Sequence, residues 1–173
     1  GSLDKVRGFS TNVSNYQPLG VDQYGSVKIS TDHPCTDLIV GQNNNEINYI
    51  NSLYNELNKS CKIKKDWKFI TDTGRNGLPD VRNSSLNNCA DWCNIKGGLG
   101  LKPSSDTQND KIDAYFWLKT PGESDGCTKD QCKSKGFDYM CGKNAPWQFS
   151  PAPDAGVFDP TIAEALWKNR RWP

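Results

Sequence analysis

The spacing of apolar residues along the chain predicts three strands and two helices. Short apolar runs at residues 6–9, 67–71 and 112–118 have the length of strands, and each ends in a polar segment. Apolar residues recur at helical spacing after Glu46 and again over residues 161–169. Strands that alternate with helices favour parallel pairing in an α/β layer. Because three strands are too few to close a barrel and leave two open edges, the pattern indicates part of a larger sheet.

The first predicted helix has a defined start and one apolar face. Asn44 or Asn45 is expected to cap it, because an Asn side chain accepts a hydrogen bond from the free N–H groups of the first turn. Cys61 follows the helix, and we expect it to pair with Cys35 and close the polar loop over residues 17–45. The apolar face carries Ile47, Ile50, Leu53, Tyr54 and Leu57.

Polar loops make up most of the remaining chain. The 173 residues include 15 Gly and 10 Pro, and the mean hydropathy is −0.76. No repeat or linker divides the sequence, so we expect one domain. The chain opens on Gly1 without an initiator Met, as expected of a processed piece or of a piece expressed by itself.

The charge and hydropathy of the chain exclude two classes of partner. A net charge of +1 produces no long-range attraction for nucleic acid or for an acidic membrane surface. No apolar run approaches the roughly 20 residues that a membrane-spanning helix needs. Six Trp, six Tyr and six Phe are many aromatic residues for so polar a chain, and they serve either as core or as stacking platforms for a ligand.

Seven cysteines indicate an oxidising compartment, so we expect a secreted, extracellular protein with disulfides. Sequons that begin at residues 12, 58 and 83 agree with secretion. Zinc is the alternative, because Cys89 and Cys93 together with Cys127 and Cys132 have the spacing of a zinc cage. A single His and long irregular loops argue against it, and we expect neither a metal nor a cofactor. The odd count leaves one thiol free or paired with a segment outside this chain.

One loop gathers a cation and two carboxylates directly after the third predicted strand. The stretch WLKTPGESDG, residues 117–126, carries Lys119, Glu123 and Asp125. A strand that delivers charged side chains into a loop is a common way to build an active site, and a solvated surface turn is the alternative. After the second strand, Asp72 and Arg75 could form a structural ion pair.

Five segments together resemble the C-terminal half of glycoside hydrolase family 6, which contains cellobiohydrolases and endoglucanases. The resemblance follows the family's order over nearly the whole chain. The family stretches RGLATNVANY, FITDTGRNG, DWCN, WVKPGGECDG and APQAG are similar to residues 6–16, 69–77, 91–94, 117–126 and 152–156 of this sequence.

The resemblance implies a fold and a reaction. The fold is the C-terminal part of a distorted, TIM-like parallel α/β barrel with long disulfide-tied loops and a groove at the carboxyl ends of the strands. The reaction is hydrolysis of β-1,4-glucosidic bonds with inversion, in which two carboxyl groups stand roughly 6.5–9.5 Å apart around the attacking water. The family's general acid comes from the N-terminal half. Residues 1–173 are therefore expected to be the C-terminal portion of one catalytic domain, and to be inactive alone.

The resemblance also assigns roles to individual residues. Asp125 matches the aspartate that acts as base or as electrostatic support for the water. Lys119 and Glu123 match residues that hydrogen-bond sugar hydroxyls, and Asn12 matches an asparagine at the groove. Trp92 matches a tryptophan that stacks on a glucose ring, because a pyranose has an apolar C–H face; a core tryptophan is the alternative.

The same resemblance pairs Cys93 with Cys141, which would anchor the loop over the groove. The stretch from Asp125 to Cys141 is at least as long as the covering loop of the exo-acting members, which favours a cellobiohydrolase over an endoglucanase. Three cysteines, Cys89, Cys127 and Cys132, stay unassigned. The expected partners are cellulose, cello-oligosaccharides and the N-terminal half of the domain.

Two other classes of protein share part of this pattern. A non-catalytic carbohydrate-binding module also combines aromatic platforms with disulfides, but it usually has a self-contained antiparallel sheet. A disulfide-rich inhibitor domain does not need Lys119, Glu123 and Asp125 together at the end of a strand.

Overall fold

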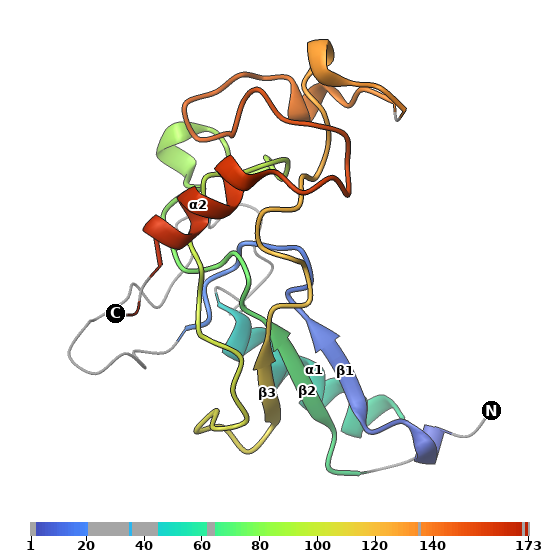
Figure 1. The fold of residues 1–173 in the computed structure, drawn as a ribbon. Helices are drawn as coiled ribbons and strands as arrows, with labels where there is room; N and C mark the ends of the chain where they lie inside the picture. The colour runs from blue at the N-terminus through green and yellow to red at the C-terminus, as the bar shows by residue number, and fades with distance from the viewer. Residues whose placement is uncertain are drawn as a thin grey trace.

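The computed structural model describes residues 3–20, 35, 45–61, 65–134, 136–170 and 172, and in these residues a parallel sheet forms the base of the molecule (Figure 1). Its strands are β1 (Gly8–Thr11), β2 (Lys68–Asp72) and β3 (Ile112–Phe116), in the order β1-β2-β3. The predicted strands and their parallel pairing are confirmed. The third strand ends at Phe116 rather than at Leu118, and the next residue, Trp117, donates its indole N–H to the Leu101 carbonyl at 2.9 Å.

The edges of the sheet are not equivalent. Among the described residues, β1 pairs only with β2 and leaves its other side open. The outer side of β3 is partly covered, because Tyr115 exchanges backbone hydrogen bonds of 2.9 and 3.1 Å with Ser104. The expectation of an open edge is therefore corrected at one position of β3, Tyr115.

Helix α1 (Glu46–Ser60) covers one face of the sheet. The Asn45 side chain accepts a hydrogen bond from the Asn48 N–H at 2.9 Å, so Asn45 is the predicted cap. The helix buries Ile50 in a core that also contains Trp67, Phe69, Ile112, Tyr115 and Leu19. Burial of such side chains is the main stabilising contribution to a layer of this kind.

Helix α2 (Pro160–Lys168) belongs to a second, smaller core. It starts at Pro160, which has no N–H to leave unpaired, and the Asp159 side chain accepts from the Thr161 N–H at 2.8 Å. Ile162 and Leu166 pack against Leu99 and Phe149. No helix in the described part of the chain is long and apolar enough to cross a membrane.

Three disulfides tie the long loops that lie beyond the carboxyl ends of the strands. Cys93–Cys141 is confirmed, and Cys127 pairs with Cys132. The expected pair of Cys35 with Cys61 is wrong: Cys35 pairs with Cys89, and Cys61 is free. Helix α1 is about 22 Å long at 1.5 Å per residue, and it carries Cys61 away from the loop end of the sheet.

The zinc alternative is also wrong. All four cysteines that it required, Cys89, Cys93, Cys127 and Cys132, are bound in disulfides. A disulfide sulfur is not a thiolate and cannot supply the usual zinc ligand.

Candidate active site

Asp72, the last residue of β2, holds together the loops that follow all three strands. Its carboxylate accepts backbone hydrogen bonds from Ser14 (3.1 Å), Gly74 (2.9 Å) and Lys119 (2.9 Å). These residues follow β1, β2 and β3 respectively, so one buried side chain fixes the relative positions of three loops. The predicted ion pair of Asp72 with Arg75 is wrong, because these backbone donors occupy Asp72 and Arg75 has another partner.

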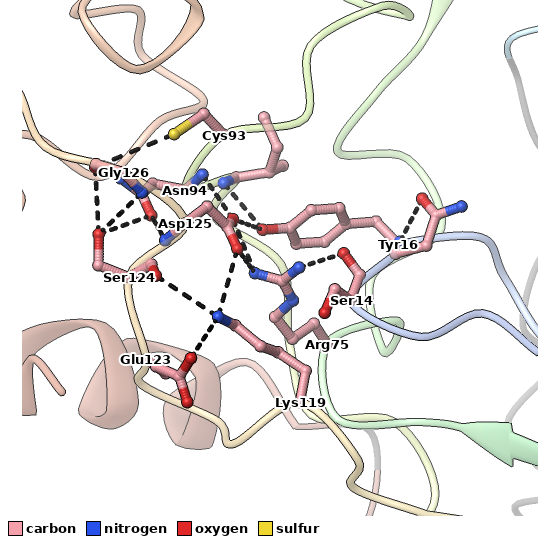
Figure 2. A network of polar contacts seen from close by, with 12 residues as sticks. Ser14, Tyr16, Arg75, Cys93, Asn94, Lys119, Glu123, Ser124, Asp125 and Gly126 are labelled. Carbon is pink, nitrogen blue, oxygen red and sulfur yellow. Dashed lines mark hydrogen bonds and ion pairs between the residues drawn. The ribbon is translucent and has the colours of Figure 1, made fainter. Parts of the chain in front are cut away.

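That partner is Asp125. The Arg75 guanidinium Nη1 lies 2.7 Å from Oδ1 and 2.8 Å from Oδ2 of Asp125. Tyr16 donates its hydroxyl to Oδ2 at 3.1 Å, and the Asn94 N–H donates to the same oxygen at 2.9 Å. The Asp125 side chain is only 7% exposed, and that of Arg75 is 5% exposed. Figure 2 shows these groups converging on Asp125 from separate segments of the chain.

Two positively charged side chains approach this carboxylate. The Lys119 ammonium lies 2.8 Å from Oε1 of Glu123 and 3.8 Å from Oδ1 of Asp125. Burial lowers the pKa of Arg75, but Tyr16 and Asp125 more than offset this, so the pKa is raised above its ordinary value. Burial also raises the pKa of Tyr16, which keeps its hydroxyl protonated as a donor.

Asn94 fixes the backbone on which Asp125 sits. Its side-chain oxygen accepts from the Asp125 N–H at 2.8 Å, and its amide group donates to the Gly126 carbonyl at 2.7 Å. Asn94 itself has a φ of 49°, a left-handed conformation that Asn tolerates better than most residues. We did not single out Tyr16, Asn94 or the Arg75–Asp125 pair from sequence. The sequence offered one signal for them: Tyr16, Arg75 and Asn94 lie within the segments at residues 6–16, 69–77 and 91–94 that carry the family resemblance.

The structure brings Lys119, Glu123 and Asp125 together. The other two predicted site residues, Asn12 and Trp92, lie two residues before Ser14 and Asn94, which contact Arg75 and Asp125 respectively. Trp92 is 42% exposed, so it is not a core tryptophan. Asn12 is only 8% exposed, and its amide donates to the Asp72 carbonyl at 2.9 Å and the Gln17 carbonyl at 3.3 Å. In this arrangement Asn12 holds the loop after β1.

Trp92 stands on a braced segment. The neighbouring Asp91 is buried, and its carboxylate accepts from the Trp147 indole at 2.7 Å and from the Lys143 ammonium. This hydrogen bond to Asp91 raises the pKa of Lys143. Together with the Cys93–Cys141 disulfide, these contacts attach residues 138–148 to the backbone on both sides of Trp92.

The assembled groups can supply a fixed negative charge, hydrogen-bond partners for hydroxyl groups and an exposed indole. A general acid would in addition need a carboxyl group that remains protonated near neutral pH. Burial raises the pKa of Glu46 to about 7, but this residue lies at the start of α1 and not in the group around Asp125.

Known proteins are similar to this chain over almost its whole length. The family model of glycosyl hydrolases family 6 matches residues 1–170. An Aspergillus terreus protein named as a 1,4-beta-D-glucan cellobiohydrolase C is 37% identical over 98% of this chain and 32% of its own length. A Fusarium oxysporum protein named as an endoglucanase type B is 36% identical over 98% of this chain and 33% of its own length.

The solved catalytic core domain of the cellobiohydrolase Cel6A from Chaetomium thermophilum matches with a TM-score of 0.72 and 34% identity, over 95% of this chain and 41% of that domain. The chain thus spans about a third of the length of the curated relatives it matches. Its three parallel strands form part of the family's TIM-like α/β barrel. By its loops, its parallel sheet and the family model that covers almost all of its residues, this chain belongs to glycosyl hydrolases family 6.

Proposed function

We propose that this chain is part of an inverting cellulase of the cellobiohydrolase type and forms the wall of the groove that supports the attacking water. The observation that carries the proposal is the buried Asp125 carboxylate held by Arg75, Tyr16 and Asn94 at the carboxyl ends of the strands. The names of the relatives favour the cellobiohydrolase type. An endoglucanase is the second candidate, because one relative carries that name.

Asp125 acts in this proposal as a fixed negative charge. A carboxylate has about four lone-pair sites, and four hydrogen bonds already reach it: two from Arg75, one from Tyr16 and one from Asn94. A direct proton acceptor would have to displace one of these donors. The charge instead stabilises positive charge that develops on the sugar ring and on the water as the water attacks.

Lys119, Glu123 and Trp92 bind the substrate. Glu123 is partly exposed and Lys119 is fixed between two carboxylates, so both can offer charged hydrogen bonds to sugar hydroxyls. Trp92 presents an indole face for the apolar side of a glucose ring. The substrates are cellulose and cello-oligosaccharides, and the three disulfides fit a protein that works outside the cell.

The general acid comes from the rest of the catalytic domain. Cleavage needs a protonated group beside the leaving oxygen. Asp125, Glu123 and Lys119 all lie on one loop after β3, so they line one side of a groove and cannot also reach across it. The partner is therefore the remaining portion of the same domain, which holds these loops in register and supplies the acid.

The purified 173-residue chain is expected to release no cellobiose from cellulose or from soluble cello-oligosaccharides. Addition of the unmatched part of the Chaetomium thermophilum domain, fused or as a separate polypeptide, should produce sustained release. Release by the chain alone that Asp125→Asn abolishes would show that the acid lies within this chain. Binding of cellulose by the combined protein without hydrolysis would instead support a non-catalytic carbohydrate-binding fragment.

Replacement of Trp92 with alanine should weaken cello-oligosaccharide binding by the combined protein by about 1–3 kcal/mol, by analogy with aromatic stacking on nucleic-acid bases. The fold should be kept, since the side chain is 42% exposed. Calorimetric titration with cellotetraose measures the loss, and the melting temperature checks the fold. Trp167→Ala is the matched control, because Trp167 is 48% exposed on α2. A fall in melting temperature at unchanged affinity would make Trp92 a structural residue.

A further inference from the structure

Trp92 depends on its neighbours for its position. Among the described residues, no hydrogen bond holds Trp92 itself, and its side chain is exposed. The residue before it, Asp91, is 1% exposed, and the residue after it, Cys93, is bound by its disulfide to Cys141. An indole on a fixed backbone loses less freedom when a sugar ring binds to it. The contacts that hold these two neighbours therefore bear on sugar affinity.

The segment of residues 138–148 occupies both carboxylate oxygens of Asp91. The Lys143 ammonium contacts Oδ1, and the Trp147 indole donates to Oδ2 at 2.7 Å. The Lys143 side chain is 25% exposed, and its ammonium lies 5.4 Å from the centre of the Tyr139 ring. Hydrogen bonds from a charged donor to a buried carboxylate are among the strong ones. Lys143 thus supplies a counter-charge that keeps the Asp91 carboxylate, and with it the adjoining backbone, in one place.

Other contacts keep this segment attached when Lys143 is changed. The Cys93–Cys141 disulfide joins it covalently to the residue after the indole. The Gln148 amide donates to the Cys93 carbonyl at 3.2 Å. Removal of the Lys143 ammonium therefore does not release the segment, and its effect on the orientation of the indole can be measured separately.

We propose that Lys143, through its ion pair with Asp91, is a positioning residue for Trp92 and sets how tightly the protein holds a glucan chain. The inference rests on the proposed function, in which Trp92 stacks on a glucose ring. Lys143 lies directly after the stretch from Asp125 to Cys141, which is expected to cover the groove. The ion pair therefore links that loop to the sugar platform. In the part of the chain that the structure describes, Lys143 contacts none of the charged groups around Asp125, so it acts on affinity and not on the chemical step.

The test measures cellotetraose binding by the combined protein in a double-mutant cycle of Lys143→Met and Trp92→Ala. Lys143→Met should raise the Kd by about fivefold to tenfold, within the range of couplings between residues that share a network. In the Trp92→Ala background the same change should leave the Kd unchanged, because the indole that Lys143 positions is gone. Lys143→Arg keeps a charged donor and should return the Kd to within about twofold of the unsubstituted protein. The kcat on the same sugar should be equal in the Lys143 variants, so that only KM rises.

Lys96→Met is the matched control. Lys96 is an exposed lysine that donates to the Pro146 carbonyl of the same segment at 2.8 Å, and in the described structure it has no contact with Asp91. Its replacement should leave the Kd unchanged. If Lys143→Met lowers the melting temperature so far that binding cannot be measured, Asp91→Asn combined with Lys143→Met removes both charges and leaves no unpaired buried carboxylate. This double variant should show the same dependence on Trp92.

Binding and hydrolysis together separate this inference from the proposed function. A Kd that Trp92→Ala raises and Lys143→Met does not would overturn the inference and keep the proposed function. An equal rise from Lys143→Met with and without Trp92 would also overturn it, because the loss would not pass through the indole. The expected pattern of Kd values without hydrolysis would support the positioning role and overturn the proposed reaction. A Kd that Trp92→Ala leaves unchanged would overturn both the stacking role and this inference.

Discussion

Replacement of Asp125 with asparagine is expected to lower kcat of the combined protein by about 100-fold to 1,000-fold, the range seen when one preorganised electrostatic group is removed from an active site. The asparagine has nearly the same shape, but it carries no charge and its amide nitrogen cannot accept a hydrogen bond, so the variant loses the negative charge and one acceptor for the surrounding donors. KM should change little, because the charge matters most as the water attacks. Initial rates on a soluble cello-oligosaccharide give both constants.

Asp113→Asn is the control for this change. Asp113 is also an aspartate attached to the sheet, but it lies in β3 and pairs with the exposed Arg7. The Asp113→Asn variant should leave kcat unchanged. If Asp125→Asn lowers kcat no more than Asp113→Asn does, then Asp125 has no part in the chemical step.

Replacement of Arg75 with methionine is expected to destabilise the folded state by about 3–5 kcal/mol, the usual cost of removing one partner of a buried ion pair. The Arg75 side chain is 5% exposed, and it also donates to the Ser14 carbonyl and covers the Tyr16 ring at 4.4 Å. Its loss leaves the Asp125 charge buried without its main counter-charge. Urea unfolding followed by circular dichroism measures the change.

Arg7→Met is the matched comparison, because Arg7 also forms a bidentate pair with an aspartate, Asp113. The Arg7 side chain is 73% exposed, so solvent screens that pair and its loss should be far smaller. The contrast depends on burial and not on distance, since the Arg7–Asp113 contact of 2.5 Å is shorter than the 2.7 Å contact of Arg75 with Asp125. Equal losses for the two variants would contradict the assignment of Arg75 as the counter-charge of Asp125.

The sequence determined the elements and their order. Apolar runs predicted β1, β2 and β3, helical spacing predicted α1 and α2, and Asn45 was one of the two residues proposed as the cap. These features depend on neighbours only a few residues away, so local patterns are enough to predict them. The loop with Lys119, Glu123 and Asp125 was also visible, because all three residues follow one strand within one short segment.

The tertiary structure decided which residue each of these groups contacts. Sequence proximity suggested that Arg75 pairs with Asp72, yet its partner is Asp125, 50 residues away. The reason is competition: three backbone N–H groups from three loops already occupy Asp72. Spacing likewise suggested Cys35 with Cys61, whereas the length of α1 separates them and Cys89 takes that place. Such partners depend on where whole loops meet in space, and periodicity along a single chain carries no information on that meeting.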